Sequence, residues 1–135
     1  MLNLWAVLAA AIANMLIGAL WYSHFLFGEQ WLAYIEMNKI KLNRIRKQGM
    51  ALSYATMLIG AWIMSYALAY FLKVAAATTA AQGLAIAFTL WLGFVAVSHL
   101  NSVLFEKKPP GYYWLTTLYY LVVLLAGSVI LTLWK

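Results

Sequence analysis

The chain has 135 residues, of which 67% are hydrophobic and only 9% are charged, and its formal net charge is +6. A water-soluble domain carries charge on about a quarter of its residues, so this composition excludes a soluble enzyme, a disordered chain and a nucleic-acid-binding domain. An integral membrane protein remains, and the absence of cysteine from the sequence also excludes disulfides and thiolate sites.

Four apolar stretches are long enough to cross a bilayer as helices, which takes about 20 residues each. They cover residues 2–22, 50–72, 81–105 and 112–134. These stretches do not alternate between apolar and polar residues, so helices are expected rather than barrel strands. The sequence therefore predicts an all-α fold, in which an integral membrane four-helix bundle forms a single domain over residues 1–135.

The first stretch is expected to be a retained span rather than a removable signal, because its apolar run exceeds the roughly 7–15 residues of such signals and no basic region precedes it. Its small side chains repeat every four residues, which predicts a surface for close helix packing. Asn14 lies about halfway along it. An amide at that depth has to meet a partner, either a substrate or ion or, as we favour, a neighbouring helix. The predicted packing surface consists of Ala6, Ala10, Asn14 and Gly18.

The connection over residues 23–49 is too long for a plain turn. Its apolar residues recur at helical spacing, which favours a helix lying in the membrane interface over a cytoplasmic extension of a spanning helix. Those apolar residues are Trp31, Leu32, Ile35, Leu42 and Ile45. Five cations also lie here, at Lys39, Lys41, Arg44, Arg46 and Lys47.

The second span carries a row of small residues at Ala61, Ser65 and Ala69. The link that follows Lys73 is short, so the second and third spans are expected to be antiparallel neighbours. Pro109 disfavours helical geometry in the residue before it, which predicts that the third span ends by about Lys107.

The distribution of Lys and Arg predicts the orientation of the chain. The two connections over residues 23–49 and 106–111 together hold seven of the nine basic residues, and the opposite side holds Lys73 and Lys135. Cytoplasmic loops are enriched in Lys and Arg, so both basic connections are expected in the cytoplasm and both termini outside. The expected location is the inner (plasma) membrane of a cell.

Polar and aromatic residues gather at the cytoplasmic ends of the first and third spans. Trp21 and Tyr22 end the first span, and Asn101 and Glu106 end the third, with His99 behind them. A structural network of His, Asn and Tyr is favoured over a metal site, because no HxxxH, HxH or ExxH spacing is present. We expect no catalytic residue, metal or cofactor. Asn14, Trp21, Tyr22, His99, Asn101 and Glu106 are the candidate ligand-binding residues.

Several of these strings together resemble the DUF1761 family of uncharacterised bacterial membrane proteins. They are Leu20-Trp21-Tyr22-Ser23, Leu26-Phe27-Gly28 with Trp31, Asn101, Leu104-Phe105-Glu106, Lys108-Pro109, Asn14, Trp91, Gly93 and the region 119–127. The likeness extends over essentially the whole chain, although the family often has Pro where this chain has His24. The resemblance implies a four-helix membrane domain and no agreed activity.

Three functions are open on this basis. The first is a non-enzymatic protein that binds a small ligand, lipid or partner at the cytoplasmic polar cluster. The second is a small transporter or channel subunit working as an oligomer, with Asn14 and His99 along its path. The third is a lipid- or quinone-directed enzyme using His99. The expected partners are the lipid bilayer and, as a further hypothesis, a second copy of the chain, but no nucleic acid.

Overall fold

The computed structural model describes residues 2–35 and 38–134, and every regular element in that part of the chain is helical. This confirms the predicted all-α fold. The elements are α1 (Leu4–Trp21), α2 (Gly28–Tyr34), α3 (Lys39–Lys47), α4 (Ala51–Val74), α5 (Ala80–Leu90), the π-helix η1 (Trp91–Ala96), α6 (Leu100–Leu104) and α7 (Pro110–Leu133).

Among the described residues, four long helical segments are apolar enough to cross a membrane, with mean hydropathies between 1.6 and 2.0. Three are α1, α4 and α7, and the fourth is the run of α5, η1 and α6 over Ala80–Leu104. The protein is therefore a membrane protein, as its composition predicts. The last span begins at Pro110 rather than residue 112, because proline fits the first turn of a helix, where its missing N–H is not needed.

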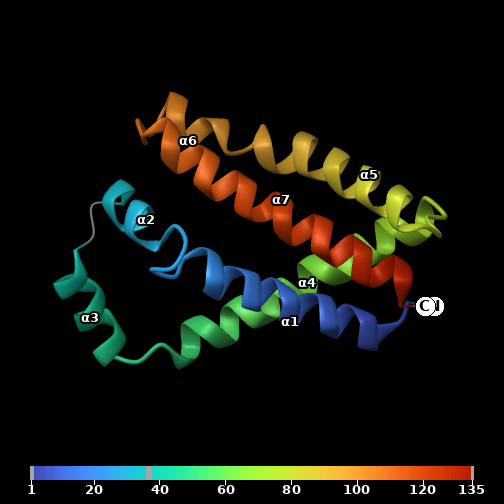
Figure 1. Cartoon of the computed structure of the whole chain (residues 1–135), viewed down its shortest axis with the longest axis horizontal. Coiled ribbons are helices and arrows are strands. Elements are labelled where there is room, and N and C mark those ends of the chain that lie inside the picture. Colours follow the sequence, from blue (N-terminus) through green and yellow to red (C-terminus); the bar gives the residue numbers. More distant parts are fainter. Residues whose placement is uncertain (1, 36–37, 135) are drawn as a thin grey trace.

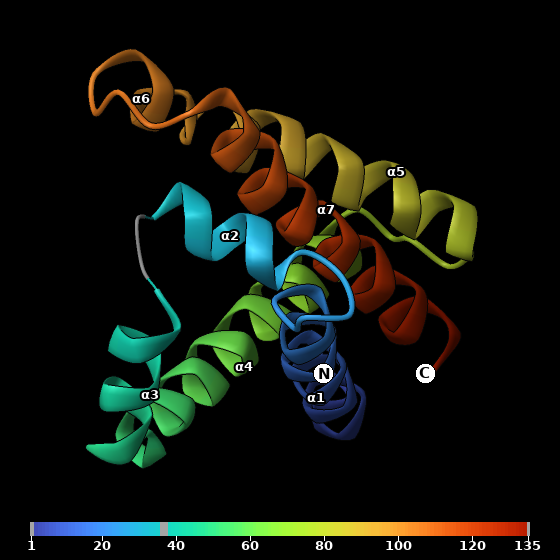
Figure 2. The same ribbon diagram turned by 60° about the vertical axis from the view of Figure 1, so that its left-hand side comes forward.

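Helix α7 lies at the centre of the bundle. In its most apolar stretch of 18 residues, 44% of the residues are buried, against 22–28% in the corresponding stretches of the other three spans. It packs against α1 and α5, while α4 crosses α1 and also contacts α7 (Figures 1 and 2). The outward faces of all four spans carry exposed large apolar side chains, as expected for helices surrounded by lipid.

The predicted rows of small residues form the contacts between helices. Ala6 and Ala10 on α1 are buried, and so are Ala61, Ser65 and Ala69 on α4. These observations confirm the packing surfaces of both spans.

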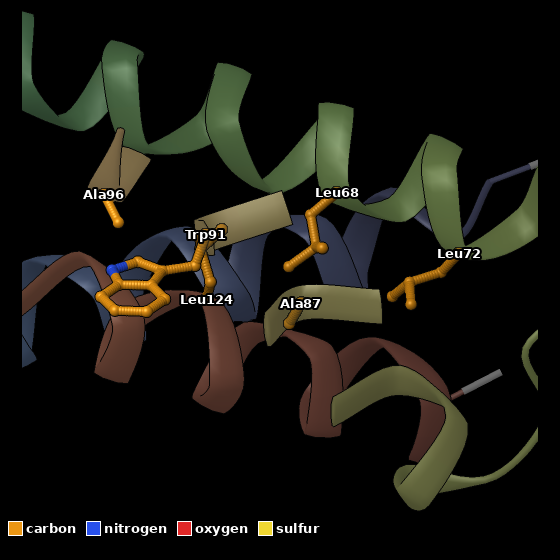
Figure 3. Close-up of a cluster of buried hydrophobic side chains, with 6 residues drawn as sticks. All are labelled: Leu68, Leu72, Ala87, Trp91, Ala96 and Leu124. Carbon is orange, nitrogen blue, oxygen red and sulfur yellow. The ribbon is translucent and has the colours of Figure 1, made fainter. Parts of the chain in front are cut away.

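A cluster of buried apolar side chains fills the space between α4, α7 and the third span, and Trp91 is its largest member (Figure 3). The indole N–H of Trp91 donates a hydrogen bond to the Thr117 carbonyl at 2.6 Å. The Tyr113 hydroxyl donates to the Ala96 carbonyl at 2.8 Å. Both bonds join α7 to the two ends of η1, so they brace the widened π-helical turn. The cluster comprises Leu68, Leu72, Ala87, Trp91, Ala96 and Leu124.

The connection between α1 and α4 holds two short helices, α2 and α3, where the sequence predicted a single one. Their position in the membrane interface stays a prediction. A tight turn separates α1 from α2, and Gly28 is needed there because a Cβ would lie 2.6 Å from the Tyr22 carbonyl oxygen. Gly49, with a φ of +97°, separates α3 from α4. Such a positive φ is readily adopted only by glycine.

The basic connections lie together at one end of the bundle. Helices α2, α3 and α6 are at this end, and the start of α1, the end of α7 and the link between α4 and α5 are at the other (Figures 1 and 2). This arrangement agrees with a shared membrane side for the two basic connections. Lys135, counted above for the opposite side, lies outside the described residues. Which end faces the cytoplasm stays a prediction.

Candidate functional site

A groove of about 1160 Å³ lies at the basic end of the bundle. Its walls come from α1, α4 and α7, and the segment 23–34 together with α3 forms its outer rim. The groove exists because α1 and α4 diverge toward this end after crossing near their middles (Figure 1). We take this groove as the candidate site.

The inner walls of the groove are apolar and flexible. Met15 and Leu16 line it from α1, and Met57 lines it from α4. Unbranched methionine side chains adapt to ligands of different shape. Leu16 and Met57 are 66% and 51% exposed, so this part of the groove opens onto the outer surface of the bundle, where lipid is the surrounding solvent.

The rim of the groove is polar. His24 and Glu29 contribute to it from the segment after α1, and Asn43 and Arg46 contribute from α3. The charged side chains of the lining, Glu29 and Arg46, therefore both belong to the connection and neither to a spanning helix. The site is graded from apolar walls to a polar rim.

Aromatic rings form the wall on the α7 side. Tyr22 and Tyr119 meet edge to face with ring centroids 5.3 Å apart, and Tyr119 lies 5.0 Å from Tyr120. Trp31 of α2 lies 5.0 Å from Tyr22. All four side chains line the groove. Such contacts fix ring positions, so this wall is more rigid than the methionine side.

Asn14 is held inside the bundle behind this aromatic wall. Its side-chain oxygen accepts a hydrogen bond from the Tyr119 hydroxyl at 3.0 Å, and its amide nitrogen lies 3.6 Å from the Met64 sulfur. Asn14 is 5% exposed and does not line the groove, whereas Gly18, one turn along α1, does. These two contacts connect Asn14 of α1 to α7 and to α4.

Trp21 and Tyr22 have different surroundings although they are adjacent. The Trp21 indole N–H donates to the Leu115 carbonyl on α7 at 3.1 Å, and its ring lies 4.7 Å from that of Phe27. Trp21 thus ties the end of α1 to α7, and Tyr22 faces the groove.

The other three predicted site residues lie away from the groove lining. His99 is half-buried, with Nδ1 2.9 Å from the Val95 carbonyl oxygen and its ring 5.8 Å from that of Tyr120. Asn101 and Glu106 are exposed. The helix is interrupted at residues 97–99 and ends at Leu104, so His99 and Glu106 do not lie on one continuous helix. The structure does not gather the six candidates into one cluster.

The family of the chain follows from its sequence match. A model of the DUF1761 family, described as a protein of unknown function, matches residues 5–132. The chain belongs to the DUF1761 family. No curated protein and no solved structure matches it.

Several groove residues of this DUF1761 protein lay outside the sequence-based prediction. His24, Glu29 and Arg46 come from the long connection, whose position over the bundle is a tertiary feature. A usable signal was present in the last span. Tyr112, Thr116, Tyr119 and Tyr120 repeat at i, i+4, i+7 and i+8, and this spacing places them on one helical face. All four line the groove.

Within residues 2–35 and 38–134, no group of three or more His, Asp or Glu side chains comes together in a way that could hold a metal ion. The groove lining of this DUF1761 protein includes aromatic rings, methionine thioethers and charged side chains of both signs.

Proposed function

We propose that this DUF1761 protein binds an amphiphilic, phospholipid-like molecule in the groove, with the polar head at the rim and an acyl chain between α1 and α4. The proposal rests on the change in polarity along the groove lining. The inner walls carry the apolar side chains of Met15, Leu16 and Met57, and the rim carries the charged side chains of Glu29 and Arg46. Ligand sites combine mainly apolar walls with a few placed polar groups, and this groove has that composition.

The size and opening of the groove support the same ligand class. A volume of about 1160 Å³ exceeds the roughly 300–1000 Å³ usual for drug-sized ligands, so it accommodates a headgroup with part of a chain. Tyr54 of α4 lines the groove and is 59% exposed, and the lining residues Leu16 and Met57 are also largely exposed. A lipid would therefore enter sideways from the bilayer, without passing through water.

The positions of Asn14 and His99 favour binding over the two alternatives. A transport path along Asn14 between two copies of the chain would need that amide to face the outside of the bundle, but it is 5% exposed and accepts a hydrogen bond from Tyr119. An enzyme that uses His99 would need a cavity beside the imidazole, and His99 is not part of the groove lining. The proposal places the groove in the cytoplasmic leaflet of the inner membrane, on the basis of the basic connections.

The test is the amount of phospholipid that stays with the purified protein after extensive detergent washing, measured by mass spectrometry. Met57→Trp should fill the groove and lower the retained lipid about tenfold, equivalent to about 1.4 kcal/mol of binding free energy. Leu58→Trp is the matched control, since Leu58 is on the same helix, is 42% exposed and is not among the lining residues. Equal lipid retention by both variants and the wild type would contradict the proposal.

A further inference from the structure

The sequence of the basic helix α3 is unfavourable for a helix in water. Its nine residues, Lys39–Lys47, carry five cations and no acidic residue. A helix this short is marginal in water, and like charges three or four residues apart weaken it further. The Lys41 cation also lies in the first turn of α3, at the positive end of the helix dipole, where cations are unfavourable.

The contacts of α3 within the chain do little to offset this repulsion. The side chain of Asn38 caps the helix by accepting a hydrogen bond from the Lys41 backbone N–H at 2.8 Å. Leu42 is half-buried and lines the groove. The remaining side chains described on α3 are exposed, and the helix lies at the edge of the molecule beyond the spans (Figure 1).

The exposed surface of α3 combines apolar and cationic groups on one side. Ile40, Asn43, Arg44 and Lys47 follow the spacing i, i+3, i+4 and i+7, and together they line a hollow of about 320 Å³. Ile40 is 71% exposed. This face has an apolar residue for insertion at the membrane surface, with cations and an amide beside it that match phosphate oxygens.

We propose that this face of α3 docks onto the surface of an anionic phospholipid bilayer, with the headgroup phosphate at Asn43, Arg44 and Lys47 and with Ile40 inserted beneath it. Charge complementarity decides the occupant, because a helix with five cations and no acidic residue favours an anionic partner, and this helix is attached to a membrane-spanning domain. Anionic lipids attract each Lys or Arg held near the membrane surface. The negative surface also relieves the repulsion that destabilises α3 in water.

The experiment uses the full chain in nanodiscs of phosphatidylcholine, with or without phosphatidylglycerol. The sequence contains no cysteine, so Ile40→Cys gives a single attachment point for a nitroxide label. Its depth is measured by the accessibility of the label to oxygen and to a water-soluble paramagnetic complex. We expect the label to lie about 5–10 Å into the interface in anionic nanodiscs and to become water-accessible in neutral ones or at high salt.

Two further variants separate charge recognition from simple apolar insertion. Arg44→Glu with Lys47→Glu should abolish the lipid dependence, and Arg44→Lys with Lys47→Arg should keep it. A label at Leu58→Cys, on lipid-facing α4, should report the same depth in both membranes. The proposal is overturned if the label on α3 has one depth in neutral and anionic membranes, or if charge reversal leaves the difference intact. The comparison between neutral and anionic membranes uses the chain without charge reversal, so it tests the proposal even if the charge-reversed variant misfolds.

Discussion

The hydroxyl of Tyr119 on α7 donates a hydrogen bond to the side-chain oxygen of Asn14 on α1, and the two atoms are 3.0 Å apart. This bond lies where α1, α4 and α7 come together, and it joins the two polar groups behind the groove wall. A Cβ on Gly18 would be 2.9 Å from the same hydroxyl, so glycine at this position leaves the space that Tyr119 needs to reach Asn14.

The first prediction concerns the strength of this bond. Tyr119→Phe and Asn14→Ala should each lower the free energy of unfolding, and the double variant should lose less than the sum. Interhelical hydrogen bonds in membranes contribute about 0.6–2 kcal/mol, so the coupling energy should lie in that range. Titration with a denaturing detergent in mixed micelles measures all four proteins. Strictly additive losses would show that the two side chains do not interact.

The second prediction concerns Gly18. Gly18→Ala should destabilise the protein by about 1–2 kcal/mol, because the added methyl group displaces the Tyr119 hydroxyl. The ring carbons of Tyr119 lie 3.6 Å from the position that this methyl group would take, which is ordinary contact. The same substitution in a Tyr119→Phe background should therefore cost much less. Comparing unfolding in the two backgrounds tests this, and an equal cost in both would place the strain elsewhere.

The third prediction concerns the brace between η1 and α7. Trp91→Phe keeps an aromatic ring in the cluster of Figure 3 but removes the donor to the Thr117 carbonyl. The loss should be about 1–3 kcal/mol, because a buried carbonyl loses a partner. Phe88→Leu, at a neighbouring position that is 47% exposed, is the control and should cost far less. An unfolding curve for Trp91→Phe that matches the wild type would mean that the indole bond does not stabilise the bundle.

The fourth prediction concerns the end of α4. Ala76 has a φ of +56°, and the N–H of Ala77 donates to the Leu72 carbonyl, as in a Schellman motif. Glycine adopts this backbone conformation without the steric cost of a Cβ, so Ala76→Gly should stabilise the protein by about 0.5–1 kcal/mol. Ala75→Gly should do the opposite, because Ala75 has a right-handed helical conformation. The prediction fails if both variants shift the unfolding midpoint in the same direction.

The spans and the internal packing rows could be predicted because both depend on local sequence. Hydropathy over about 20 residues identifies a span, and the four-residue repeat of Ala6, Ala10 and Asn14 identifies the face that packs. The π-helix at Trp91–Ala96 could not be predicted in this way. It is braced by side-chain bonds to α7, and these partners are distant in sequence.

The candidate site was predicted less completely than the fold. Tyr22 was singled out and lines the groove, but Asn101 and Glu106 are exposed elsewhere. Proximity to one membrane surface could be read from the sequence, but the direction of each side chain could not. For Tyr22 the surroundings depend on how the connection folds back at Gly28, and for Asn101 and Glu106 they depend on the interruption of the third span at residues 97–99.

The most direct test of lipid binding in the groove is photo-crosslinking in native membranes with a phospholipid that carries a diazirine in its acyl chain. Peptide mapping should concentrate the crosslinks at Met15, Leu16 and Met57, because these side chains line the apolar walls. Phe94 is 71% exposed on the third span, outside the groove lining, and reports ordinary contact with bulk lipid. Crosslinks as frequent at Phe94 as at Met57 would contradict the account.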